Sequence, residues 1–183
     1  MTAYLITDPI SYGHTPNSLT STLYEAAKYH TVNYACLRDK SAENYDELSL
    51  SFIAAAKELG IKPILHTFWQ KAAIYGAFGV HFGTVDFQNI PFAKEQGLFV
   101  VASTHSLEEA LTATSLGADF VTISPVFYTP NKNKPLGLEK LKEITDKIPD
   151  KCIALGGILH EEQIQECINA GAVGFASIRY FLK

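Results

Sequence analysis

The chain has 183 residues, a mass of 20.1 kDa and 47% apolar residues. This is enough for one well-buried core and too little for two comfortable domains, so we expect one domain over residues 1–183. A net charge of −4, an isoelectric point near 5.8 and the lack of any Lys/Arg block argue against binding to nucleic acid or to a membrane surface. There is neither a membrane-spanning run nor a basic leader after Met1, and Cys36, Cys152 and Cys167 lack metal-ligand spacing, so we expect a cytoplasmic protein with reduced, buried thiols.

In the first half of the chain, apolar runs rich in β-branched and aromatic residues alternate with segments of helical spacing. Strands are expected over residues 3–7, 32–37, 62–66 and 79–82, and helices over residues 18–30, 45–59 and 69–75. The polar segment 11–18 is predicted to be a loop. Gly60 and Gly76 mark helix ends, and Gly83 opens a loop that carries Asp86.

The second half continues this alternation. Residues 91–96 predict a short helix and residues 98–102 a strand, after which Ser106 and Glu109 have the spacing of a capping box for a helix that runs to Gly117. Strands follow over residues 120–123, 152–155 and 173–177, with helices over 138–147 and 161–170. Between Pro125 and Gly137 the prolines and asparagines predict a long loop.

Eight strands alternating with about seven helices predict parallel strands joined by right-handed crossovers, and their number favours a closed (β/α)₈ (TIM) barrel. The alternative is an open doubly wound sheet, which suits the short chain better but usually holds five or six strands. Only Ile178 to Lys183 remain after the last strand, so the eighth helix should be very short or missing.

In such a barrel the carboxyl ends of all strands open onto one face, where active sites of this fold lie. The polar residues at these ends should therefore converge: Arg38, Lys40, His66, Thr67, Asp86, Ser103, His105, the loop from Thr129 to Lys134, Gly156 and Gly157. Lys132 and Lys134, with Thr129 and Asn131, have the chemistry to bind a phosphorylated ligand, and the alternative is a solvated loop with incidental lysines.

Three of these positions have two interpretations each. Gly156 and Gly157 follow the seventh strand, where barrels often bind phosphate through backbone N–H groups, but a turn with positive φ would also require glycine. Asp86 suits one ligand position of Mg²⁺, or a solvated loop acid. His105 stands next to a helix start, which favours a packing or capping role over a catalytic one.

The successive strand-end motifs resemble those of the thiamine phosphate synthase and TenI family. The motifs are YLITD, CLRDK, GVHFGTVD, VASTHSLEEA, SPVFYTPNK, IALGGI and GAVGFA, which cover Tyr4 to about Ile178 in order and spacing. The resemblance implies a barrel, often a homodimer, that acts on a thiazole phosphate. The synthase joins this phosphate to an aminopyrimidine methyl pyrophosphate with Mg²⁺ and releases pyrophosphate, whereas TenI-type relatives isomerise a thiazole carboxylate phosphate.

The resemblance also implies roles for single residues. Arg38 and Lys40 match the cations that bind pyrophosphate, Ser103 the serine near it, and Asp86 one of two Mg²⁺ ligands. The loop residues Thr129 and Lys132 match positions that contact the substrates, and Gly157 matches the thiazole phosphate site.

Several positions depart from the family pattern. The synthase has Asn-Asp where this chain has His66-Thr67, so one metal ligand is replaced; Thr67 lies nineteen residues before Asp86, the interval of the two acids in the synthase. Asn131 replaces a threonine, and Arg179 replaces a phosphate-binding serine in a way that could preserve binding. Pro125 occupies the position of the tautomerase histidine. Three hypotheses follow: a transferase with a degenerate, weak Mg²⁺ site, a tautomerase-type isomerase, or a non-catalytic barrel that binds a phosphorylated ligand.

Overall fold

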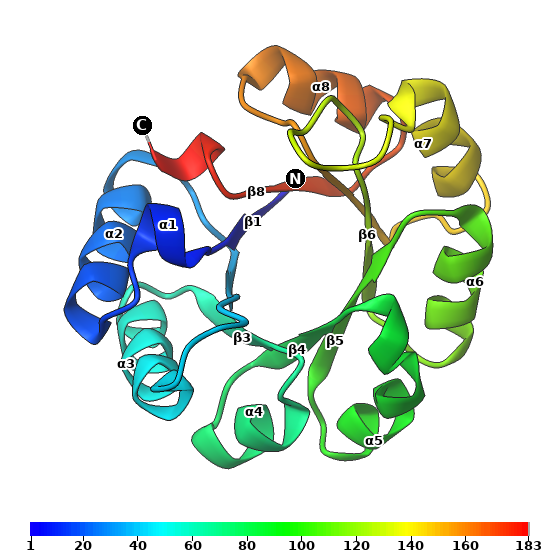
Figure 1. The fold of residues 1–183 in the computed structure, drawn as a ribbon. Helices are drawn as coiled ribbons and strands as arrows, with labels where there is room; N and C mark the ends of the chain where they lie inside the picture. Colours follow the sequence, from blue (N-terminus) through cyan, green and yellow to red (C-terminus); the bar gives the residue numbers. More distant parts are fainter. Residues whose placement is uncertain (183) are drawn as a thin grey trace.

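Eight parallel strands close into a barrel in the computed structural model, which describes residues 1–182 (Figure 1). Each strand pairs with its neighbour in sequence, and β1 pairs with β8 through Thr2↔Gly174 and the three following residue pairs. This last pairing confirms the predicted (β/α)₈ barrel and excludes the open sheet. The strands are β1 (Thr2–Ile6), β2 (Tyr34–Leu37), β3 (Lys62–His66), β4 (Gly79–Phe82), β5 (Phe99–Thr104), β6 (Phe120–Ile123), β7 (Cys152–Leu155) and β8 (Gly174–Ser177).

The helices surround this barrel, and most lie where the sequence predicts them (Figure 1). Bounds differ from the predictions by one or two residues at most helix ends, where capping decides the last hydrogen bond. In residues 1–182 they are α1 (Pro9–Tyr12), α2 (Pro16–Tyr29), α3 (Tyr45–Glu58), α4 (Trp69–Tyr75), η1 (Thr84–Asn89), α5 (Ile90–Glu95), α6 (Leu107–Ser115), α7 (Gly137–Thr145), α8 (Glu161–Asn169) and η2 (Tyr180–Leu182), where η denotes a 3₁₀-helix.

Two short helical turns were predicted to be loops. The segment after β1 contains α1, because Asp8 accepts a hydrogen bond from the Ser11 N–H and Pro9 occupies the first turn, where its missing N–H costs nothing. The segment after β4 forms η1, which runs directly into α5. At the end of the chain only the 3₁₀ turn η2 follows β8, as expected from the few residues that remain.

The core has two parts because strand side chains alternate between the barrel interior and the helices. On β1, Leu5 packs outwards against the helices, whereas Tyr4 and Ile6 point into the barrel. All three cysteines are free and buried, as predicted. The buried interior cluster consists of Tyr4, Ile6, Cys36, Ile64, Val101, Ile153 and Ala176.

Aromatic side chains fill the end of the barrel at which the strands begin. The rings of Tyr34 and Phe99 stack with centroids 5.4 Å apart, and Phe120 meets Phe99 edge to face at 5.2 Å. The Lys62 ammonium lies 5.1 Å from the Tyr34 centroid. With this end filled, a ligand has access to the interior from the carboxyl ends of the strands. Among residues 1–182, no helix has the length and apolarity needed to cross a membrane.

Candidate functional site at the barrel mouth

The carboxyl ends of the eight parallel strands, with the loops that follow them, form one face of the barrel, which we call the barrel mouth. The predicted site residues lie in the last residues of these strands or in the segments that follow them, so the structure brings them to the same face. They are Arg38 and Lys40 after β2, His66 and Thr67 at β3, Asp86 in η1, Ser103 in β5, Thr129, Asn131 and Lys132 after β6, Gly156 and Gly157 after β7, and Arg179 after β8.

A neutral histidine and two cations lie together at the mouth. Burial, together with the positive charges of Arg38 and Lys40, lowers the pKa of His66 to about 4. The imidazole is therefore uncharged at neutral pH. The Arg38 backbone N–H donates to Thr7 Oγ1 at 3.0 Å, which fixes the start of this loop to the end of β1. Such a cluster is suited to an anion.

Thr67 occupies a backbone conformation that is unusual for its type. Its φ is 68°, in the left-handed region, where a β-branched residue is strained. Its N–H donates to the His81 carbonyl at 2.9 Å, and its hydroxyl lies 2.8 Å from His66 Nδ1. The turn after β3 is thus held by β4, the strand that leads to Asp86.

Asp86 is half-buried in η1, with its N–H donating to the Gly83 carbonyl at 3.0 Å. Among the residues described, no three His, Cys, Asp or Glu side chains are grouped to hold a metal ion. A single carboxylate fits Mg²⁺ where phosphate oxygens of a ligand complete the coordination. Asp86 thus fits as one ligand, whereas the Thr67 hydroxyl is already used by His66.

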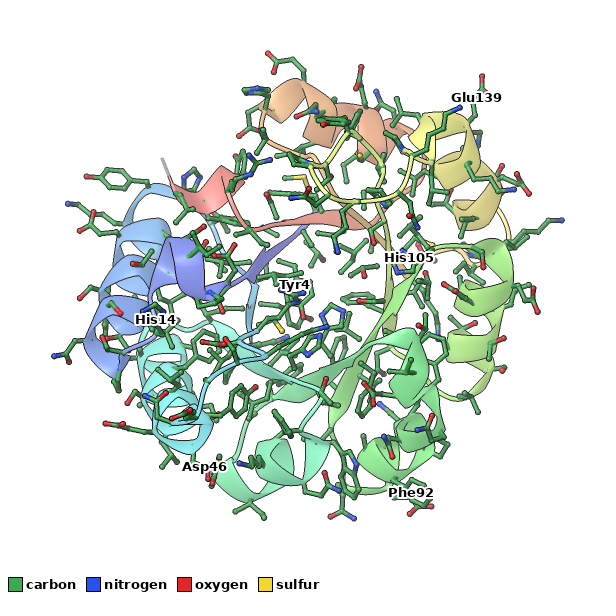
Figure 2. All side chains as sticks on the ribbon, viewed as in Figure 1. Tyr4, His14, Asp46, Phe92, His105 and Glu139 are labelled. Atoms are coloured by element: carbon green, nitrogen blue, oxygen red, sulfur yellow. The ribbon has the colours of Figure 1, made fainter. Side chains whose placement is uncertain are left out.

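A chain of hydrogen bonds that the sequence did not predict leads from the barrel interior to the mouth. The Tyr4 hydroxyl lies 2.8 Å from His81 Nδ1, and His81 Nε2 lies 2.8 Å from Ser103 Oγ. Figure 2 shows Tyr4 inside the ring of strands. Burial, His66 and Arg38 hold the pKa of His81 well below its usual value. The one sequence feature that could have indicated this series of hydrogen bonds is a histidine, His81, within the short apolar strand 79–82.

The loop after β6 packs closely on the turn after β7. The N–H groups of Val126 and Phe127 donate to the carbonyls of Leu155 and Gly156 at 2.9 and 3.0 Å. A Cβ on Gly157 would lie 2.5 Å from the Tyr128 carbonyl oxygen, and its φ is 71°. Close approach and positive φ therefore account for the two glycines, which is the simpler of the two predicted interpretations.

Lys132 and Asn131 are exposed on that loop, and Thr129 is half-buried. The Lys132 N–H donates to the Thr129 carbonyl at 3.2 Å, and the Thr129 hydroxyl donates to the Phe127 carbonyl at 3.2 Å. Asn131 has a φ of 59°, a conformation that asparagine tolerates. The loop therefore forms a tight turn that presents its cation to solvent beside the mouth.

His105 has the capping and packing role that the sequence favours. Its Nδ1 lies 2.6 Å from the Ser124 carbonyl, so Nδ1 carries the hydrogen, and its backbone N–H donates to Glu109 Oε2 at 2.6 Å. Ser106 Oγ accepts from the Glu109 N–H at 3.1 Å. The predicted capping box is thus half formed, because the Glu109 carboxylate accepts the N–H of His105.

Arg179 is exposed just after β8, next to the turn after β7. These two segments are tied together because the Ser177 hydroxyl donates to the Ile158 carbonyl at 2.9 Å and accepts from the Tyr180 N–H at 3.2 Å. Gly157 and Arg179 therefore belong to neighbouring loops of the mouth, as a shared phosphate subsite would require.

Comparisons with known proteins agree on one family. The family model described as "Thiamine monophosphate synthase" matches residues 3–181. A protein of Aquifex aeolicus named "Putative thiamine-phosphate synthase 2" is 34% identical over 98% of this chain and 97% of its own length. The thiamine-phosphate synthase of Albidiferax ferrireducens is 30% identical over 96% of this chain and 81% of its own. A solved structure of thiamine phosphate pyrophosphorylase from Pyrococcus furiosus superposes with a TM-score of 0.83 at 28% identity, covering 97% of this chain and 85% of that one.

Proposed function

Because the chain belongs to the thiamine monophosphate synthase family, we propose that it joins a thiazole phosphate to hydroxymethylpyrimidine pyrophosphate and releases pyrophosphate. The observation that carries this proposal is the cluster at the mouth, where the charges of Arg38 and Lys40 help to keep the His66 imidazole neutral. Arg38 and Lys40 supply the positive charge that a leaving pyrophosphate requires, while the buried Asp39 carboxylate between them accepts hydrogen bonds from the backbone N–H and hydroxyl of Ser41.

Loss of pyrophosphate from the pyrimidine methyl group places negative charge on the leaving oxygen. Arg38 and Lys40 would bind that charge, and Lys132 would approach it from the loop after β6. Ser103 would donate a hydrogen bond to the same group. Each of these contacts gains strength as the charge develops, so it lowers the barrier more than it stabilises the bound substrate.

Asp86 would hold Mg²⁺, which supplies charge neutralisation for phosphate oxygens when it is bound. The chain offers one carboxylate here, because Thr67 occupies the second acid's position and its hydroxyl contacts His66. We therefore expect weak Mg²⁺ binding, with the protein's own cations carrying more of the pyrophosphate charge.

The second substrate would bind on the opposite side of the mouth. Gly157 lies next to Ser177 and Arg179 through the hydrogen bond that joins β8 to the turn after β7. The Arg179 guanidinium would pair with the thiazole phosphate, a planar donor in place of the family's serine. Thr129, Asn131 and Gly156 would complete this side of the site.

The His66–Thr67 pair favours a second candidate, a barrel that binds a phosphorylated ligand without turnover. The third candidate, a tautomerase-type isomerase, is less well supported because Pro125 stands where its histidine would be. Incubating the chain with thiazole phosphate, the pyrimidine pyrophosphate and Mg²⁺ separates the transferase from the binding protein, and incubation with a thiazole carboxylate phosphate tests the isomerase. Release of pyrophosphate in step with thiamine phosphate supports the transferase.

Two variants make this assay specific. Arg38→Ala should reduce the rate at least tenfold, because one charge-assisted contact is worth about 1.5–3 kcal/mol. Lys28→Ala removes a cation from the last turn of α2, at the opposite end of the barrel, and should leave the rate unchanged. Binding of both substrates without either product would replace the transferase with the binding protein.

A further inference from the structure

Three side chains from three strands form a continuous hydrogen-bonded chain along the inside of the barrel. Tyr4 of β1 and His81 of β4 are fully buried, with 1% and 2% of their surface exposed, and Ser103 of β5 is half-buried at the mouth. Cys36 belongs to the same interior cluster as Tyr4 and lies close enough to interact with it electrostatically. The order of the hydrogen-bonded side chains from the interior to the mouth is therefore Tyr4, His81, Ser103.

Each link of this chain has a direction, because His81 carries a single N–H. Its ring is enclosed in the barrel with His66 and Arg38 nearby, and these disfavour the imidazolium. If Nε2 carries the hydrogen, Tyr4 donates to Nδ1, and Nε2 donates to Ser103. If Nδ1 carries it, Nδ1 donates to Tyr4 and Ser103 donates to Nε2.

The two directions differ in whether the Ser103 O–H group can donate a hydrogen bond at the mouth. In the first, Ser103 Oγ accepts from His81 and its own O–H is free to donate at the mouth. In the second, that hydrogen is used inside the barrel. Thr122, which pairs with Ser103 in the β5–β6 register, has a buried hydroxyl with no partner among the described residues, so it does not take the Ser103 hydrogen.

The chemistry of the inner links favours the first direction. A phenol is a better donor than acceptor, and an imidazole nitrogen is a strong acceptor for it. In the second direction the Tyr4 hydrogen would have no partner other than the neighbouring Cys36 sulfur, which is a weak acceptor. Burial raises the pKa of Cys36 to about 12, so the thiol keeps its hydrogen and does not become an anionic acceptor for Tyr4.

We propose that Tyr4 and His81 are positioning residues that fix the Ser103 hydroxyl as a hydrogen-bond donor toward an anionic oxygen of the bound pyrophosphate group. This inference rests on the proposed function for the identity of the acceptor. The direction of the hydrogen bonds does not depend on the proposed function, because Tyr4, His81 and Ser103 define it in the protein without a ligand. No net proton transfer is involved: every hydrogen stays on its atom.

The direction can be measured without any ligand. In protein labelled with ¹⁵N-histidine, the two ring nitrogens of a neutral histidine differ in chemical shift according to which one carries the hydrogen, and a His81→Gln variant identifies the signals of His81. We expect the Nε2–H form in the wild type. A Tyr4→Phe variant lacks the donor to Nδ1, so the Nδ1–H form should appear.

Affinity for inorganic pyrophosphate, measured by calorimetry, tests the consequence at the mouth. Tyr4→Phe should weaken binding about three- to tenfold, the net value of one hydrogen bond. Ser103→Ala should weaken it at least as much, and the double variant no more than Ser103→Ala alone. Tyr34→Phe is the control, because it deletes the hydroxyl of another interior tyrosine that has no hydrogen bond to Tyr4, His81 or Ser103 in the structure. It should leave both the His81 tautomer and the affinity for pyrophosphate unchanged.

The outcomes separate this inference from the proposed function. An Nδ1–H signal in the wild type, or unchanged affinity in Tyr4→Phe beside weakened binding in Ser103→Ala, overturns the positioning role. An Nε2–H signal without measurable affinity for pyrophosphate overturns the proposed function and the assigned acceptor, while the direction of the chain stands.

Discussion

Replacing Thr67 with aspartate should recreate a two-acid Mg²⁺ site beside Asp86. Thr67 lies at the end of β3 and Asp86 follows β4, two strands that pair through Leu65↔Val80 and His66↔His81. The backbone there already suits the change, because φ at Thr67 is 68° and Asp and Asn adopt this region far more readily than threonine. A strained residue of this kind costs about 1–3 kcal/mol, part of which either substitution should recover.

Two opposing effects accompany that gain. Both variants lose the contact between the Thr67 hydroxyl and His66 Nδ1, worth about 1 kcal/mol unless the new side-chain oxygen replaces it. Only Thr67→Asp adds a second negative charge near Asp86, which destabilises the metal-free protein. Thr67→Asn is therefore the matched control, since it has the same shape and backbone preference without the charge.

Added Mg²⁺ should stabilise Thr67→Asp by about 2.7 kcal/mol at a hundred times its dissociation constant. For a chain of this size, 1 kcal/mol moves the melting temperature by about 2–4 °C, so the expected shift is about 5–10 °C. The wild type and Thr67→Asn should shift little. Adding Asp86→Asn to Thr67→Asp should remove the shift.

Melting curves with and without Mg²⁺ decide between these expectations. Equal shifts in Thr67→Asp and Thr67→Asn would mean that position 67 does not face Asp86. A shift that survives Asp86→Asn would place the bound metal elsewhere. Either result would overturn the assignment of the metal position to these two loops.

Three further predictions concern the mouth. In urea unfolding, Gly157→Ala should destabilise the fold by about 1–3 kcal/mol more than Gly60→Ala does. Both glycines have a φ of 71°, but only at Gly157 would the new Cβ meet a backbone atom, at 2.5 Å. Equal losses of stability in the two variants would contradict the close packing at Gly157. The pKa of His66 is about 4 in the folded protein against 6.5 for a free histidine, so the unfolded chain binds a proton at a higher pH than the folded protein does. The free energy of unfolding should therefore fall by up to about 3 kcal/mol as the pH drops from 6.5 to 4. The variant His66→Gln should reduce this pH dependence, and an unchanged dependence would assign it to other groups. Arg179→Ala should weaken the binding of thiazole phosphate, measured by calorimetry, at least tenfold, and Arg179→Lys should retain part of the affinity. An unchanged affinity in Arg179→Ala would mean that Arg179 is not part of the site.

The strands were predictable because local chemistry bounds them. Residues 62–66, 79–82, 120–123 and 152–155 were predicted with the bounds that the structure has, since apolar runs there end at glycine, proline or polar residues. The closed barrel followed from their number and alternation. The short helices α1 and η1 were missed because one or two turns are too short to show a hydrophobic period.

The polar chain inside the barrel could not be predicted in the same way. Tyr4 and His81 are 77 positions apart, and their contact depends on the closure of the barrel and the register between strands. From the sequence, both residues are simply members of apolar strands. Strand-end residues were accessible to prediction because the topology alone places them on one face, whereas contacts across the interior require the register.

The resemblance implies that Thr67 stands where the synthases have an acid, and such a replacement would change the balance of charge at the mouth as well as the number of metal ligands. With a carboxylate at position 67, His66 would have an anionic neighbour that raises its pKa; with the neutral hydroxyl there, burial, Arg38 and Lys40 keep the imidazole uncharged. The mouth then carries one negative charge fewer than a two-acid site. We therefore expect an anionic ligand to bind to Arg38 and Lys40 with less dependence on Mg²⁺ than in a two-acid site. The Ser103 hydroxyl, which we propose that His81 holds as a donor, would add to the same preference.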